Sequence, residues 1–332
     1  MTTTRNTQWV LASRPAGRVE ESNFTLIDAA LPPLQDGQAL VKVHYLSLDP
    51  YMRGRMDDAK SYAAPQALNT VMIGGTVGEV VESKTDALRP GDMVVGMGGW
   101  QQYVVTDARG VRTIDTRQIP ASAYLGVVGM PGVTAWYGLL RIGAPKAGET
   151  VVVSAASGAV GSVVGQLAKI HGCRAVGIAG GRAKCEYVTH ELGFDACIDY
   201  KSDSAHADFA AATPHGVDIV FENVGGRVFD MALARMNVSG RVALCGLIAG
   251  YDGQDIALRH VRSILVNRLT VTGFIVSDHM DIWPEALREL AHHVATGTLK
   301  YRESIAVGIE NAPGAFIGLL KGENFGKQLV KL

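Results

Sequence analysis

Three small residues at a regular spacing, Ala155, Gly158 and Gly161, are the feature of this chain that points most directly to a chemistry. A β-branched run precedes them, and an apolar stretch without proline and with helical periodicity follows. A turn without bulky side chains lets the backbone approach a pyrophosphate, and the helix N-terminus adds N–H groups and a favourable dipole. We interpret residues 151–172 as a dinucleotide-binding strand, turn and helix. The alternative is an ordinary parallel-sheet crossover whose glycines only permit close packing.

The segment after the next strand would select the nucleotide. An Asp or Glu about twenty residues beyond the glycines would bind a ribose 2′-hydroxyl and repel a 2′-phosphate. No such acid is present; Arg182 and Lys184 follow the run Arg174–Ile178. Because Lys and Arg bind phosphate through charge-assisted hydrogen bonds, the sequence favours NADPH over NADH. On the alternative interpretation both cations are solvated residues that open the following helix.

Length and composition limit the number of domains and the kinds of partner that this chain can have. A chain of 332 residues is roughly twice a typical domain, so two domains are expected. A net charge of −1 gives no chain-wide attraction for nucleic acid or for an anionic membrane. The first residues lack the apolar core of a signal peptide, and no run approaches the ~20 apolar residues that span a bilayer. We therefore expect a cytoplasmic protein.

The cysteines, Cys173, Cys185, Cys197 and Cys245, are well separated and include no C-x-x-C pair. This spacing argues against a disulfide framework and against a four-cysteine zinc site. We expect them to be reduced and mostly buried.

Strand-like and helix-length segments alternate from about residue 126 to residue 300. The short apolar runs are 151–154, 174–178, 196–199, 218–221 and 241–246. This alternation is typical of an α/β fold with a doubly wound parallel sheet, which binds ligands at the carboxyl ends of its strands. Residues 1–120 instead hold shorter β-like pieces separated by Pro and Gly, which indicates a mostly β domain. These pieces are 39–44, 78–81, 92–95 and 102–105.

Six strings, in order along the whole chain, resemble one known family. They are LSLDPYMRGRM (46–56), VGMPGVTAWYGLL (128–140), AASGAVGSVVGQLAK (155–169), LGFDACIDYK (192–201), FENVGG (221–226) and KGENFGKQLVKL (321–332). The chain resembles the zinc-independent medium-chain reductases, in the group of leukotriene/prostaglandin reductases and plant alkenal double-bond reductases. Within this group, DAKSYAAP (58–65) and CGLIAGYDG (245–253) are most similar to bacterial NADPH-dependent curcumin reductases.

The resemblance implies two domains and no metal. A GroES-like, mostly β catalytic domain would span 1–125 and be completed by 311–332, and a Rossmann NADPH-binding domain would span 126–310. Zinc alcohol dehydrogenases of the same superfamily take ligands from a Cys and from a Gly-His-Glu segment, where this chain reads YLSLD (45–49) and IGGT (73–76). Without thiolate or imidazole a tetrahedral catalytic zinc cannot be assembled, so simple alcohol oxidation is not expected.

The resemblance also assigns contacts to the cofactor. It places Gly158, Ala159, Val160 and Gly161 on the pyrophosphate and Lys184 and Tyr200 at the 2′-phosphate. Around the nicotinamide half it places Met130, Thr134, Asn223, Cys245, Gly246, Leu247, Ile248, Tyr251, Phe274, Ile275, Val276 and Asn324. Competing interpretations make Tyr200 a surface aromatic, make Asn223 and Asn324 turn residues, and make Phe274–Val276 plain core strand.

Reduction of an enone requires a group that stabilises the enolate oxygen as hydride reaches the β-carbon. A neutral phenol can donate a hydrogen bond to that oxygen and then a proton. The resemblance places three tyrosines for this task, with Tyr251 first, Tyr62 second and Tyr51 shaping the pocket; the alternative makes each a wall residue. Ser277 stands where animal and plant relatives carry a further tyrosine, which shifts the task toward Tyr251 and Tyr62.

We therefore expect an NADPH-dependent ene-reductase that transfers hydride to the β-carbon of α,β-unsaturated ketones or aldehydes of the curcumin or alkenal type. Its partners would be a small-molecule enone or enal and a second copy of the chain, paired along a strand at 269–276, with no nucleic acid or membrane. An NADPH quinone oxidoreductase is the nearest alternative. A non-catalytic NADPH-binding interaction protein is an alternative of another class.

Overall fold

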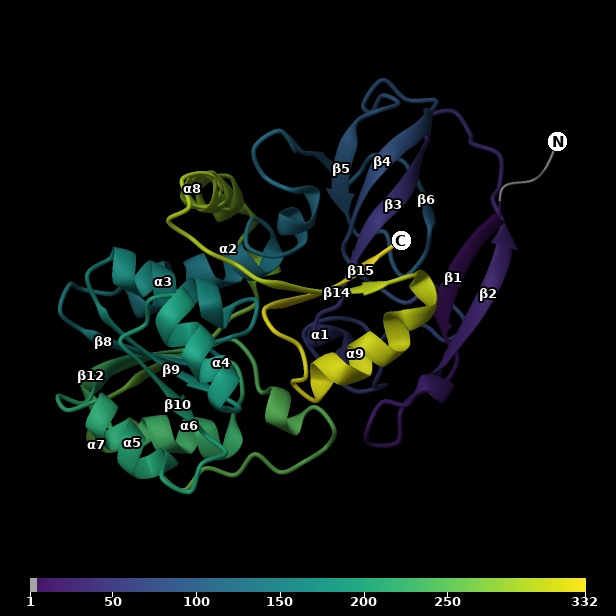
Figure 1. Ribbon diagram of the computed structural model, residues 1–332. Coiled ribbons are helices and arrows are strands. Elements are labelled where there is room, and N and C mark those ends of the chain that lie inside the picture. Colours follow the sequence, from purple (N-terminus) through teal and green to yellow (C-terminus); the bar gives the residue numbers. More distant parts are fainter. Residues whose placement is uncertain (1–4) are drawn as a thin grey trace. The chain divides into compact units, whose positions relative to one another are not determined.

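The structure, a computed structural model, describes residues 5–332 and forms two compact units (Figure 1). One unit contains Val127–Arg302, and the other contains the described residues up to Gly126 together with Glu303–Leu332. No helix within residues 5–332 is both long and apolar enough to cross a membrane.

The unit Val127–Arg302 is built on a six-stranded parallel sheet with the order β10-β9-β8-β11-β12-β13. The strands are β8 (Thr150–Ser154), β9 (Arg174–Ala179), β10 (Ala196–Asp199), β11 (Val217–Glu222), β12 (Met236–Leu244) and β13 (Thr270–Gly273). The chain runs outward from β8 to β10 and then continues at β11 on the opposite side of β8. The strand order therefore reverses between β8 and β11, and their carboxyl ends form the crevice where ligands bind in such sheets.

Helices on both faces bury this sheet, which explains why its strands are almost continuously apolar (Figure 1). The helices are α2 (Met130–Tyr137), α3 (Gly161–Ile170), α4 (Arg182–Glu186), α5 (Ala205–Ala212), α6 (Gly226–Leu233), α7 (Arg262–Val266) and α8 (Trp283–Ala295). Phe209 of α5 and Phe229 of α6 pack with Val152 and Val220 in one core. On α3, Gly165 lies so close to Phe194 that an added Cβ would be 1.8 Å from the ring.

The other unit is mostly β. Its main sheet has the order β14-β15-β3-β4-β5-β7, with β6 also paired to β3, and β1 and β2 form a separate antiparallel pair. The strands are β1 (Arg5–Leu11), β2 (Phe24–Ala30), β3 (Ala39–Ser47), β4 (Thr76–Ser83), β5 (Met93–Gly96), β6 (Tyr103–Thr106), β7 (Arg112–Thr113), β14 (Glu303–Val307) and β15 (Lys327–Lys331). Helices α1 (Tyr51–Arg55) and α9 (Ala312–Leu320) complete it. Trp100 stacks on Phe24 and meets Phe316 of α9 edge-on, which ties the C-terminal segment to the first strands.

Three expected boundaries differ from the structure. The chain returns to the β unit at Glu303 and not at residue 311, because β14 pairs in parallel with β15. Strand β12 ends at Leu244, where the regular ladder stops because the N–H groups of the next two residues both donate to the Glu222 carbonyl at the end of β11. The run expected as a strand at 269–276 is β13 only to Gly273, because the chain turns into a 3₁₀ segment at Val276–Asp278.

Candidate active site

The turn between β8 and α3 folds back on itself. Ala155 adopts a left-handed φ of 51°, and the N–H of Gly158 donates to its carbonyl at 2.9 Å. A Cβ at Gly161 would lie 2.4 Å from the same carbonyl oxygen, so only glycine fits where α3 begins. Ala159 and Val160 lie between these points, directly before α3. In the first turn of α3 the N–H groups of Ser162 and Val163 already donate to the Gly158 and Val160 carbonyls. A pyrophosphate would therefore take its hydrogen bonds from the backbone N–H groups of the turn itself, at 159–161.

A cationic group of residues follows β9 and β10. Lys184 of α4 is half-buried, and burial together with repulsion from Lys201 lowers its pKa. The Lys201 ammonium lies 6.0 Å from the centre of the Tyr200 ring, and a Cβ on Gly180 would lie 3.1 Å from the Tyr200 hydroxyl. Two like charges held together on a partly dry surface favour an anion between them, because an anion relieves their repulsion.

Arg182 lies on the same short helix as Lys184 but has a different environment. Its side chain is 90% exposed and pairs with Glu186 at 2.6 Å, one helical turn away. Arg182 is therefore a solvated residue at the start of α4, as the alternative interpretation of the sequence expected. Lys201 is the residue that the sequence reasoning missed; its position next to Tyr200, at the carboxyl end of the run 196–199, is the signal that could have identified it.

At the crevice between β8 and β11, two residues hold each other through two hydrogen bonds. The Asn223 backbone N–H donates to Ser154 Oγ at 2.7 Å, and its side-chain Nδ2 donates to the Ser154 carbonyl oxygen at 2.8 Å. The amide group of Asn223 is therefore fixed in orientation, with its carbonyl oxygen as the acceptor that it offers at the carboxyl edge of the sheet.

Glu222 lies under this pair and is completely buried. Its Oε1 accepts hydrogen bonds from the backbone N–H groups of Val224 and Gly225, both at 2.6 Å. Burial raises the pKa of this carboxyl to about 7, against the opposing effect of these hydrogen bonds. Glu222 thus shapes the turn that presents Asn223.

The loop Cys245–Tyr251 lies against the loop that follows β11. The N–H groups of Cys245 and Gly246 donate to the Glu222 carbonyl, and that of Ile248 donates to the Asn223 carbonyl at 3.2 Å. A Cβ on Gly246 would lie 3.6 Å from the Tyr251 hydroxyl and 3.9 Å from the Asn223 Cα. The structure therefore brings Tyr251, Gly246 and Asn223 together at the switch point. Leu247 is half-buried and begins the 3₁₀ turn of this loop.

The other residues of the nucleotide unit that were expected at the nicotinamide half lie on α2 and in the segment after β13. Met130 and Thr134 lie one turn apart on α2, where the Thr134 hydroxyl donates to the Met130 carbonyl at 2.8 Å. The Phe274 ring meets Phe221 edge-on, 6.1 Å between centres, so it belongs to the packing beneath the sheet edge. Ile275 is half-buried and Val276 is buried where the chain turns away from β13.

The remaining expected residues belong to the β unit. Tyr51 opens α1, and burial, with the charges of Asp49 and Tyr62, raises the pKa of its phenol well above the ordinary value. Tyr62 is 59% exposed. Asn324 donates from its side chain to the Gly326 carbonyl at 2.8 Å, which makes it part of the turn before β15. Within this unit the structure brings Tyr51 and Tyr62 together.

A buried ion pair occupies the stretch that corresponds to a zinc-ligand segment. Lys327 Nζ lies 2.5 Å from Asp49 Oδ1 and 2.7 Å from the Leu48 carbonyl, and the Ser47 hydroxyl donates to the other oxygen of Asp49. The single carboxylate in this stretch is therefore already neutralised by an ammonium group. Residues 5–332 hold no group of three or more His, Cys, Asp or Glu that could bind a metal ion. A catalytic zinc does not fit these side chains.

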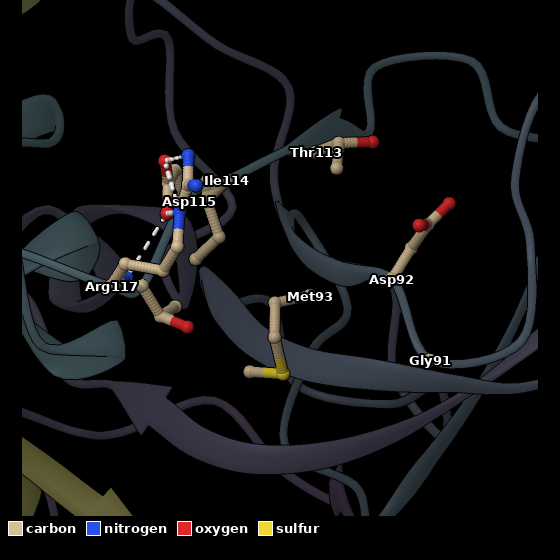
Figure 2. A pocket seen from close by; sticks show the side chains of 8 residues that line it. Gly91, Asp92, Met93, Thr113, Ile114, Asp115 and Arg117 are labelled. Atoms are coloured by element: carbon tan, nitrogen blue, oxygen red, sulfur yellow. Dashed lines mark hydrogen bonds and ion pairs between the residues drawn. The ribbon is translucent and has the colours of Figure 1, made fainter.

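A shallow hollow of about 510 Å³ in the β unit does not involve any of the expected residues (Figure 2). Arg117 pairs there with Asp115, whose pKa falls to about 2 through hydrogen bonds from that guanidinium. The charges of Arg117 and Asp115 cancel each other, and Asp92 is the other charged residue that lines the hollow.

Comparison with known proteins finds similarity along almost the whole chain. Residues 7–114 match the family described as N-terminal domain of oxidoreductase, and residues 159–292 match the family described as zinc-binding dehydrogenase. The chain is 46% identical to the NADPH-dependent curcumin reductase of Escherichia coli, over 99% of this chain and 97% of that protein. It is 38% identical to the NADP(+)-dependent 2-alkenal reductase of Nicotiana tabacum (98% and 97%) and 40% identical to prostaglandin reductase 1 of Rattus norvegicus (97% and 98%).

A solved structure is similar to the same extent. The crystal structure of CurA in complex with NADPH from Vibrio vulnificus has a TM-score of 0.94 at 44% identity, over 99% of each chain. The structure of a putative NADPH:quinone reductase from Bacillus thuringiensis has a TM-score of 0.77 at 17% identity, which shows a shared fold alone.

Proposed function

Since this chain belongs to the medium-chain dehydrogenase/reductase family, in the group of NADPH-dependent double-bond reductases, we propose how its own residues divide the reduction of an α,β-unsaturated ketone or aldehyde. The protein is an NADPH-dependent oxidoreductase that acts on C=C bonds. The proposal concerns the residue roles and the substrate class, which includes curcumin-like dienones and alkenals.

The residues of the nucleotide unit fit NADPH at three points. The backbone of Gly158–Gly161 would hold the pyrophosphate, while Lys184, Lys201 and Tyr200 would hold the 2′-phosphate. Asn223, fixed by Ser154, would orient the nicotinamide half. When bound, the cofactor supplies a hydride; the protein contributes orientation, because hydride transfer needs near-attack geometry.

We assign the proton donor to Tyr251. The observation that carries this assignment is the placement of its hydroxyl beside Gly246 and Asn223, at the carboxyl edge where the strand order reverses. A phenol there would donate a hydrogen bond to the enolate oxygen and then its proton. Tyr62 is exposed and serves substrate binding, while Tyr51 is held neutral by burial and shapes the substrate wall.

Initial rates of NADPH oxidation with curcumin, a simple enone, an enal and a quinone test the proposal, each repeated with NADH. Turnover of enones and enals with a strong preference for NADPH is the expected result. Turnover of quinones alone would favour a quinone oxidoreductase. Tight binding of NADPH without turnover of any of the four would favour a non-catalytic NADPH-binding protein and overturn the proposal.

We further propose that the protein is a homodimer paired along β13. This strand is an edge of the six-stranded sheet, and the adjoining α7 segment exposes Val261 (54%), Leu265 (79%) and Val266 (51%). A second copy paired along β13 would cover this apolar surface and extend the sheet. Leu265→Glu should shift sedimentation toward the monomer, whereas Met97→Glu, at an exposed position of the β unit, should not. A native chain that sediments as a monomer at micromolar concentration would refute the dimer.

A cytoplasmic location completes the proposal. Its support is the demand for NADPH and the absence of any membrane-spanning helix within residues 5–332. Fractionation of source cells tests it.

A further inference from the structure

Two cysteines that the reaction does not use face each other next to the cationic group. Cys185 belongs to α4 and Cys197 to β10, and their thiols interact directly. Cys197 pairs in register with Gly177 of β9, and its Sγ lies 3.2 Å from where a Cβ on that glycine would be. The missing side chain at Gly177 thus leaves the space that the Cys197 thiol occupies.

The two thiols share a hydrogen bond, which favours a thiolate on one of them. The hydrogen bond with Cys197 lowers the pKa of Cys185, although burial opposes this, while the same interaction and burial raise the pKa of Cys197. Both residues are only partly buried. Cys173, in contrast, is buried, and burial raises its pKa. A partly exposed cysteine with a lowered pKa is the thiol that oxidants attack first, and a neighbouring thiol can then resolve the product.

We propose that Cys185 and Cys197 form a redox site that a hydroperoxide converts to a disulfide. The Cys185 thiolate attacks the terminal peroxide oxygen, the O–O bond breaks, and an alcohol leaves with a proton while Cys185 becomes a sulfenic acid. The Cys197 sulfur then attacks the Cys185 sulfur, the S–O bond breaks, and the hydroxyl group leaves as water with the thiol proton. Two thiols are oxidised by two electrons, and the peroxide is reduced to alcohol and water.

The consequence for the cofactor rests on the function proposed above. Lys184 immediately precedes Cys185 on a helix of five residues, and Lys201 follows β10 by two residues. A disulfide holds its sulfurs about 2 Å apart, closer than two thiols in contact, so closure draws α4 toward β10 and moves Lys184. Because a charge-assisted hydrogen bond depends on position, the KM for NADPH should rise about fivefold, while the KM for NADH stays the same.

Mass spectrometry of the full chain after peroxide treatment tests the redox site. Trypsin releases residues 185–201 as one peptide that contains both cysteines and no internal Lys or Arg. After oxidation and alkylation of the native protein, this peptide should be two hydrogens lighter and unalkylated, and dithiothreitol should restore alkylation at both positions. Cys173→Ser should behave like the native chain, and Cys197→Ser should leave a sulfenic acid on Cys185 that dimedone traps. Alkylation of both cysteines after peroxide would overturn the site.

Kinetics separate this inference from the proposed function. The oxidised enzyme should show the raised KM for NADPH, and dithiothreitol or the Cys185→Ser substitution should abolish that change. A disulfide with an unchanged KM would overturn the regulatory consequence. In the reduced enzyme, Lys184→Ala should weaken the preference for NADPH over NADH. If that preference persists while the disulfide still forms, the 2′-phosphate assignment fails and the redox site stands.

Discussion

The two ends of the proposed cofactor site, both in the nucleotide unit, are built on different principles. At the 2′-phosphate end, Lys184 is half-buried and Lys201 is exposed, and their charges repel each other. At the nicotinamide end, Asn223 is tied by short hydrogen bonds to Ser154, above a completely buried Glu222. Recognition at the first end depends mainly on charge, and at the second it depends mainly on hydrogen bonds that fix an orientation. The difference predicts that substitutions at the first end change cofactor choice, whereas those at the second change the rate.

The largest effect should come from Tyr251→Phe. Loss of the proton donor should lower kcat about 100-fold, within the range of general acid catalysis, and leave the KM for NADPH nearly unchanged. Steady-state rates with a simple enone measure it. The matched variant Tyr62→Phe, at an exposed phenol, should mainly raise the KM for the enone. Equal kcat values for the native enzyme and Tyr251→Phe would show that Tyr251, at the nicotinamide end, is not the proton donor.

The next effect is a change of cofactor preference in Lys184→Ala. Loss of a charge-assisted hydrogen bond to phosphate costs about 2 kcal/mol, so kcat/KM with NADPH should fall about 30-fold and that with NADH should stay the same. Lys201→Ala should act in the same direction with a smaller effect. Arg182→Ala is the control, because that side chain is exposed and paired with Glu186. An equal loss with NADPH and NADH would remove the distinction between the two ends.

The buried carboxyl of Glu222 predicts an unusual pH dependence of stability. Its pKa is raised by burial to about 7, so the folded state binds more protons than the unfolded state, whose ordinary value is 4.5. The free energy of unfolding should therefore fall as pH rises from about 4.5 to 7, by about 3 kcal/mol. Urea unfolding at pH 5 and pH 8 should show Glu222→Gln losing this dependence, and an unchanged slope would contradict the prediction.

Glu149 supplies a control of opposite sign. Burial tends to raise the pKa of this carboxyl, but hydrogen bonds from Arg241 and the Lys146 backbone hold it below the ordinary value. Its contribution to stability is therefore present above pH 4.5 and is lost as pH falls through the lowered pKa. Glu149→Gln should lessen the loss of stability in acid and leave the dependence between pH 5 and 8 unchanged.

The smallest effect should come from Ser154→Ala. The change removes the acceptor for the Asn223 N–H but keeps the carbonyl that holds its side chain, so about 1 kcal/mol of positioning is lost. The expected result is a kcat/KM about fivefold lower with NADPH and with NADH alike. A loss with NADPH alone would show that Ser154 affects the choice between NADPH and NADH, which would contradict the proposed difference between the two ends.

Much of the fold follows from local sequence patterns. The run 196–199 is β10 as expected, and 174–178 lies within β9, because short apolar runs between helix-length segments are typical of the strands of a parallel sheet. Gly161 was assigned to a tight turn, and the contact with Ala155 shows why no other residue fits. The preference for NADPH could likewise be inferred from Lys184, since its residue type and its place after the run 174–178 already indicate a cation near the expected site.

Other features depended on contacts between distant residues. The pairing of β1 with β2 and that of β14 with β15 join strands that are separated in sequence. Short apolar runs therefore do not predict which strands pair. The role of Glu222 was also missed, because FENVGG (221–226) reads as a turn until burial shows that the carboxylate, and not solvent, satisfies its N–H groups.

The sequence by itself determined the parallel sheet, the tight glycine turn before α3 and the cationic character of the segment proposed to bind the 2′-phosphate. These depend on residue type and spacing within about twenty-five residues. The tertiary structure decided that Lys201 joins Lys184 while Arg182 faces solvent, that Ser154 orients Asn223, and that Cys185 meets Cys197. Each of these depends on which strand ends become neighbours, and the hydrogen bonds and desolvation that follow arise only when the sheet is assembled.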